Sequence, residues 1–211
     1  MSAAYSSQCA YFNELLILAR NDRSLNTQMI TKMKKVTITK VLFLTLVGVS
    51  ISSMILCQSD RSKRPSPPAT ATGKVNGATI TIDYSSPAVK GRKIWGGLVP
   101  YNKVWRTGAN EATLISTDKE ISVEGKSLPA GKYSMYTIPG EKEWVFIFNS
   151  QTGQSGVKAN EETSEDPAKD VLRVTVKPEK SSSFNERMKF EVEKTGFSLL
   201  WENLKVPVSI R

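Results

Sequence analysis

The residues from Gly91 to Thr113 (GRKIWGGLVPYNKVWRTGANEAT) include the side chains of this chain that are best suited to chemistry. Large aromatic rings stand there beside charged and amide groups, and four glycines and a proline interrupt the stretch. An amphipathic strand does not need this density of rings, charges and turn-forming residues. Flat rings stack on sugars and peptides, and an arginine binds a carboxylate through two parallel hydrogen bonds. The stretch therefore predicts a shaped surface that binds a ligand.

This ligand-binding hypothesis defines one predicted face of the folded domain. Its members are Asp83, Arg92, Trp95, Tyr101, Trp105, Arg106, Asn110 and Glu111. Tyr84, Tyr133, Ser134 and Tyr136 are further candidates for the same face. The rings would supply stacking planes, and Arg106 would hold a carboxylate. The expected partners are a glycan, a peptide or another carboxylate-bearing molecule, or a protein of the cell envelope.

Two other interpretations of these residues remain open. In a structural one, the rings fill the core or a sheet edge, and Arg106 pairs with Glu111. In an enzymatic one, Asp83 and Glu111 form the carboxylate pair of a hydrolase that acts on envelope or extracellular polysaccharide, which needs the two groups roughly 5–10 Å apart. An open pocket lined by Trp105, Arg106 and Glu111 would favour binding or catalysis. An enclosed Trp105 and a neutralised Arg106 would favour packing.

The composition excludes most catalytic machinery. The chain has no histidine, and its two cysteines, Cys9 and Cys57, precede the predicted folded domain. A Ser-His-Asp or Cys-His apparatus, a His-ligated metal and a disulfide framework are therefore excluded. The acids between residues 161 and 170 lack the spacing and the glycine of a calcium loop. We predict no catalytic residue, no metal and no cofactor, and the net charge of +9 includes no basic run that would bind nucleic acid.

The N-terminal part has the pattern of a secretory signal. Met33-Lys34-Lys35 precedes a mostly apolar run from 41 to 56, and Cys57 follows it. Residues 33–57 are therefore predicted to be a signal or an anchor helix, with three processing outcomes: lipidation at Cys57, cleavage after the small residues Ser50 and Ser52, or retention as a membrane anchor. Residues 1–32 are interpreted as a non-native or disordered extension, with translation beginning at Met33. We expect an exported protein, periplasmic or at the outer membrane or cell surface, held to the membrane by its N-terminal lipid or helix.

Beyond the signal, the chain is predicted to contain one all-β domain. Residues 58–72 are rich in Pro, Ser and Thr and are predicted to be a flexible linker, so the domain would span 73–211. Two-residue alternation of apolar and polar side chains predicts strands at 79–84, 112–117, 120–124, 132–138, 144–149, 171–177, 188–193, 197–202 and 206–210. Their spacing favours an antiparallel β-sandwich, with a jelly roll as one variant. The polar residues 151–170 are predicted to be a long loop or a short helix.

Several stretches resemble a bacterial family catalogued as domain of unknown function 2911. The most specific are WRTGANEAT and LPAGKYSMYTIPG, and the resemblance extends from Arg64 to Arg211, through DVLRVTVKP and the closing WENLKVPVSI. It implies an exported, β-rich bacterial domain whose activity is not established, and it assigns no catalytic residues. The loop after Asn149 departs from the family pattern because it lacks aromatic residues. A ligand that contacts this loop would therefore differ from those of other members.

Overall fold

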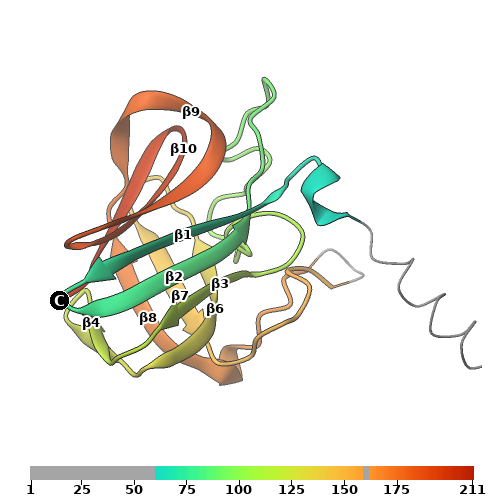
Figure 1. Ribbon diagram of the computed structural model, residues 1–211. Helices are drawn as coiled ribbons and strands as arrows, with labels where there is room; N and C mark the ends of the chain where they lie inside the picture. Colours follow the sequence, from blue (N-terminus) through green and yellow to red (C-terminus); the bar gives the residue numbers. More distant parts are fainter. Residues whose placement is uncertain (1–59, 159–161) are drawn as a thin grey trace, which may run out of the picture. The chain divides into compact units, whose positions relative to one another are not determined.

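The computed structural model describes residues 60–158 and 162–211, and in this part the chain is mostly β with antiparallel sheets (Figure 1). The largest sheet has six strands in the order β1-β2-β3-β6-β7-β8. Their bounds are β1 Pro68–Val75, β2 Ala78–Ser85, β3 Thr113–Thr117, β6 Gly131–Ile138, β7 Trp144–Asn149 and β8 Asp170–Val176. Neighbouring strands in this sheet follow chain order, apart from a small hairpin inserted between β3 and β6. The antiparallel, mostly β architecture that the alternation predicts is confirmed.

Two hairpins and two short 3₁₀ turns complete the described part. The small hairpin pairs β4 (Ile121–Val123) with β5 (Lys126–Leu128), and the long one pairs β9 (Glu179–Glu193) with β10 (Gly196–Ser209). The turns are η1 (Arg61–Lys63) and η2 (Pro167–Lys169). Among the described residues, no helix is long and apolar enough to cross a membrane. The predicted signal, the extension 1–32 and Cys57 lie outside the described residues.

The core lies between the six-stranded sheet and the β9–β10 hairpin, which curls over one face of the sheet in Figure 1. In β2, Ala78, Ile80 and Ile82 are buried while the residues between them are not. Hairpin side chains such as Phe197 and Leu199 belong to the same buried cluster. Strand alternation thus gives each layer one apolar face, and burying both faces together stabilises the domain.

The structure corrects the predicted beginning of the domain. Strand β1 starts at Pro68 and pairs with β2 from Pro68↔Ser85 to Val75↔Ala78, so residues 68–72 belong to the sheet and not to a linker. The Pro and Thr content concealed this strand because it lies at the sheet edge, where proline is tolerated. Its side chains are half-buried or exposed up to Lys74, which leaves a weak apolar signal. An Asn76-Gly77 turn with positive φ at both residues then connects β1 to β2.

The last strands are longer than predicted. Strand β9 begins at Glu179, whereas the alternation placed its beginning at residue 188. The two predicted strands 197–202 and 206–210 form one strand, β10, which has register shifts around Glu202. Glu202 has a φ of 56°, so the irregularity bends the strand without ending it. Likewise, the predicted strand 120–124 is β4 plus the first residue of a tight turn at Glu124-Gly125.

Candidate functional site

Four tryptophans form a cluster that fixes the middle of the 91–113 segment. Trp95 packs edge-to-face on Trp144 and Trp201 with ring centroids 5.0 and 5.6 Å apart, and Trp105 stacks on Trp201 at 5.9 Å with an interplanar angle of 17°. Trp144 and Trp201 are fully buried, while Trp95 and Trp105 are half-buried. Most of the ring surface that was predicted to stack on a ligand therefore packs against other rings, as the structural interpretation expected.

The backbone of Trp105 is held as firmly as its ring. Its N–H donates to the carbonyl of Thr137 at 2.7 Å, and its carbonyl accepts from the N–H of Thr137 at 2.9 Å. The indole Nε1–H donates to the carbonyl of Gly108 at 3.1 Å. Trp105 is thereby bridged to Thr137 in β6, and this bridge fixes the backbone from which the next side chain, that of Arg106, extends.

Arg106 is half-buried and has no acidic partner among the described residues. Its aliphatic part lies so close to Gly156 that a Cβ added there would come within 2.0 Å of the Arg106 Cδ. Its Nε is buried without a hydrogen-bond acceptor, and no ion pair in the described part of the chain includes this guanidinium. Burial lowers the pKa of Arg106 from its ordinary value. A cation in this position lacks the compensation that buried charges normally have.

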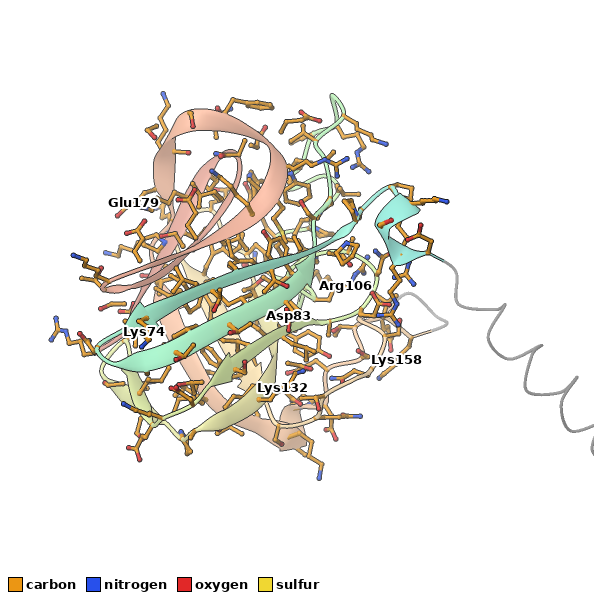
Figure 2. The ribbon with its side chains drawn as sticks, in the orientation of Figure 1. Lys74, Asp83, Arg106, Lys132, Lys158 and Glu179 are labelled. Carbon is orange, nitrogen blue, oxygen red and sulfur yellow. The ribbon has the colours of Figure 1, made fainter. Side chains whose placement is uncertain are left out.

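Trp105 and Arg106 line a pocket of about 690 Å³. One wall comes from the segment around Trp105 and the other from the loop after β7, with Arg106 and Lys158 at the end of the sheet where β1 begins (Figure 2). The lining is mostly apolar with several charged groups; it consists of Leu98, Pro100, Lys103, Val104, Trp105, Arg106, Gly156, Val157, Lys158, Glu162, Thr163, Glu165 and Pro167. A concave apolar surface with a few polar groups is typical of a small-molecule site.

The acidic and the basic side chains of this pocket differ in whether they have partners. Glu165 is buried and accepts from Arg173 Nη2 at 2.9 Å, while Arg173 also binds Asp170. Glu162 has a partner of its own. The cations Lys103, Arg106 and Lys158 have no ion pair within the described residues. Among the described residues, the acids of the lining are engaged and its cations have no ion pair, so this lining presents positive charge to a ligand.

Glu165 gives the first testable prediction. Burial raises the pKa of its carboxyl above the ordinary 4.5, and the nearby Asp170 carboxylate raises it further, against the attraction of Arg173. The folded state therefore binds this proton more tightly than the unfolded state, so the contribution of Glu165 to stability falls as pH rises from about 4.5 through the folded pKa. Glu165→Gln should remove this dependence and raise the free energy of unfolding at neutral pH, on the order of 1 kcal/mol.

Thermal unfolding between pH 4 and 8 tests this prediction, read as the difference in Tm between Glu165→Gln and the wild type. The difference should grow with pH across this range. Glu162→Gln is the control, because Glu162 is an exposed acid on the same pocket wall. A Tm difference that is constant with pH would show that Glu165 has an ordinary pKa.

Glu111 does not lie in this pocket. Both of its oxygens accept from Arg64 Nη1, at 2.9 and 3.0 Å, and Arg61 lies 3.7 Å from one of them. The hydrogen bond from Arg64 is the largest cause that lowers the pKa of Glu111. The structural interpretation paired Arg106 with Glu111, but in the structure Glu111 forms its ion pair with Arg64. Neighbouring Asn110 has a φ of 58° and donates from Nδ2 to the carbonyl of Ser66 at 3.0 Å.

The remaining predicted site residues are dispersed. Asp83 is exposed on β2 and accepts from the hydroxyl of Thr70 at 2.7 Å. Arg92 donates to the carbonyls of Ala88 and Val89, so it braces its own turn. Tyr101 packs over Gly96, where a Cβ would lie 2.9 Å from its ring. Burial raises the pKa of Tyr101 above its ordinary value.

The tyrosines that were added to the face also separate. Tyr84 and Tyr133 belong to the main core cluster, whereas Tyr136 belongs to a smaller cluster on the other side of β6 with Ala112 and Ile147. The Tyr136 hydroxyl accepts from Gln154 Nε2 at 2.9 Å, and Ser134 is fully buried. These side chains hold the sheet and its loop together and do not extend the pocket.

Sequence reasoning pointed to the loop after Asn149 as a possible ligand contact but did not identify the residues of this second wall. Gly156, Lys158 and Glu165 come from the polar segment after Asn149, where no hydrophobic period indicates a position. The only sequence signal there is a glycine close to a lysine, which is too common to be specific. No group of three or more acids or cysteines in the described ranges could hold a metal ion.

The comparisons with known proteins give one match. No curated protein and no solved structure matches this chain. A family model described as "Protein of unknown function (DUF2911)" matches residues 66–210, which is more than half of the chain and includes both walls of the pocket. The protein therefore belongs to the DUF2911 family.

Proposed function

We propose that this protein binds a carboxylate-bearing ligand in the pocket beside Trp105, with Arg106 as its anchor. One observation carries the proposal: Arg106 is half-buried, its Nε has no acceptor, and it has no acid partner among the described residues. An uncompensated cation costs stability, and a bound carboxylate would compensate this charge through charge-assisted hydrogen bonds to the guanidinium. Lys103 and Lys158 on the same lining add to the attraction of an anion.

The pocket favours a ligand with an apolar body beside its carboxylate. Leu98 is 47% exposed, and Pro100, Val104, Val157 and Pro167 lie along the same lining. An acidic peptide or an acylated amino acid has this chemistry. A neutral glycan does not, and the Trp95 and Trp105 rings that would stack on its sugars pack against other tryptophans. Of the predicted ligand classes, the carboxylate-bearing molecule is therefore the one that the geometry supports best.

The hydrolase alternative has no comparable support. Asp83 is hydrogen-bonded to Thr70 and Glu111 to Arg64, and neither residue lines the pocket.

We also propose that the sheet and its covering hairpin form a β-sandwich. The chain-ordered strands of the large sheet favour a meander within it over a jelly roll. Export through residues 33–57, with lipidation at Cys57, would place the pocket in the cell envelope.

A binding screen tests the proposed function directly. Tryptophan fluorescence of the full chain is recorded during titration with N-acetylphenylalanine, with its uncharged amide and with the neutral glycan chitotriose. Because Trp105 lines the pocket, an occupied pocket should change this emission. The acid should bind at least tenfold more tightly than the amide, since only the acid offers two oxygens to Arg106. Equal affinity for acid and amide, or tighter binding of chitotriose, would reject the carboxylate assignment.

Gly156 supplies a second prediction about the same pocket. Gly156→Ala should push the Arg106 side chain from its place, because the added Cβ would overlap the Arg106 Cδ. We expect affinity for N-acetylphenylalanine to fall about tenfold, the cost of misplacing one charged anchor. Gly153→Ala in the same loop is the control, since an added Cβ there meets nothing within 4 Å and only the backbone strain of its positive φ remains. Equal losses in the two variants would show that Gly156 acts only through the loop backbone.

A further inference from the structure

An N-terminal arm, defined here as residues 60–66, lies against the segment that supports the pocket. Asp60 caps η1 by accepting from the N–H and hydroxyl of Ser62, and Arg64 follows directly. The arm is fastened by the Arg64–Glu111 pair, by the bond from Asn110 Nδ2 to the Ser66 carbonyl and by a longer bond from Arg187 Nη1 to the Pro65 carbonyl at 3.4 Å. Figure 1 shows η1 at the same end of the sheet as the loop after β7.

The residues that receive the arm also hold the loop beneath Arg106. The N–H of Gly156 donates to the carbonyl of Asn110 at 3.2 Å, and the N–H of Ala112 donates to the carbonyl of Gln154 at 3.5 Å. Glu111 itself forms an antiparallel bridge with Ser155. One face of the 110–112 segment thus contacts the arm, while its backbone pairs with residues 154–156.

These contacts form a continuous path from the arm to the pocket. Arg64 binds Glu111, Glu111 is bridged to Ser155, and the next residue, Gly156, lies under the Arg106 side chain. Arg64 and Arg61 both pair with the Glu111 carboxylate, and the Glu111 side chain is 43% exposed. A partly exposed ion pair contributes little to global stability. We therefore expect the contact of Arg64 with both Glu111 oxygens to act mainly on the local order of the 110–112 segment.

We infer that Arg64 and Glu111 are positioning residues of the Arg106 pocket: their ion pair holds the 110–112 segment so that Gly156 stays in place beneath the guanidinium. Neither residue touches the ligand. The predicted effect on the ligand rests on the proposed function, whereas the predicted effect on the loop does not. The arm also joins the described domain to the preceding chain, so any change that detaches it would loosen the pocket.

Amide hydrogen exchange in the ligand-free full chain tests the effect on the loop. Arg64→Ala and Glu111→Gln should each speed exchange at the amides of Gly156 and Ala112 about tenfold, the loss expected from a partly exposed charge-assisted pair. The control is Lys63→Ala, because Lys63 pairs with Asp60 in the same arm and does not contact Glu111. Unchanged exchange at Gly156 and Ala112 in Arg64→Ala would overturn the inference, as would an equal acceleration throughout the sheet.

The affinity for N-acetylphenylalanine gives a second readout. It should fall about threefold to tenfold in Arg64→Ala and in Glu111→Gln, with no further loss in the double variant, because both changes break one contact. The exchanged pair Arg64→Glu with Glu111→Arg should restore slow exchange and affinity, which a role of either side chain alone would not allow. If the wild type binds no acid, the proposed function fails, and the exchange rates alone decide this inference.

Discussion

Arg106→Met should make the protein more stable and should weaken the binding of the proposed carboxylate ligand. The methionine keeps the aliphatic contact with Gly156 and removes a half-buried cation whose Nε has no acceptor. Removing an uncompensated charge should raise the free energy of unfolding by about 1 kcal/mol. The same change should weaken the binding of N-acetylphenylalanine about 100-fold, because about 3 kcal/mol of charge-assisted hydrogen bonding is lost.

The opposite signs make this prediction specific. If Arg106 had a structural role, its substitution would lower the free energy of unfolding. If it were merely exposed, its substitution would change neither the free energy of unfolding nor the affinity for the acid. Urea denaturation and the fluorescence titration measure both on one preparation. Arg92→Met is the control, because Arg92 braces its own turn through the carbonyls of Ala88 and Val89 and does not line the pocket. A destabilised Arg106→Met variant that still binds the acid would contradict the account of this residue.

Trp201→Ala should be the most destabilising of the substitutions considered. Trp201 is 1% exposed and is the ring on which Trp105 stacks and against which Trp95 packs. Truncating a fully buried tryptophan costs about 3–5 kcal/mol, through lost transfer free energy and the cavity that remains. For a domain of this size the Tm should fall by roughly 10 °C or more. Calorimetry or circular dichroism measures the change.

The matched control for Trp201→Ala is Phe184→Ala, since Phe184 is a large apolar side chain that is 55% exposed on β9. Its removal should change stability by less than about 0.5 kcal/mol. Trp201→Phe should retain part of the ring contact and lose less than the alanine variant. A small loss in Trp201→Ala would show that the tryptophan cluster does not hold the segment around Trp105.

The sheet was predictable wherever alternation was strong. In β2 the sequence ATITIDYS alternates clearly, and the structure buries Ala78, Ile80 and Ile82 as expected. The prediction was wrong at β1, where Pro, Ala and Thr at a sheet edge carry little apolar signal. It was also wrong at residues 203–205, which the alternation leaves as a break between two strands and which the structure includes in β10, next to the irregular pairing at Glu202. Local pattern gives the faces of strands, whereas edges and bulges depend on pairing.

For the candidate site, sequence reasoning identified one wall of the pocket but not the other. Trp105 and Arg106 were selected by residue type, and both line the pocket. Glu111 was selected by the same reasoning, but its partner Arg64 lies 47 residues away in a segment that was interpreted as linker. The loop with Gly156 and Glu165 has no periodic pattern, so only its pairing with the 110–112 segment shows its role. Long-range pairing was the missing information in both cases.

The most direct test of the central claim is the NMR signal of the Arg106 Nε–H, assigned by its absence in Arg106→Met. In the free protein this group is buried without an acceptor, which slows its exchange with water while leaving the hydrogen unbonded. We expect N-acetylphenylalanine to shift this resonance in a saturable way, whereas the corresponding amide should leave it unchanged. Saturable binding of the acid that perturbs other residues and leaves the Arg106 resonance unmoved would contradict the claim that Arg106 anchors the ligand.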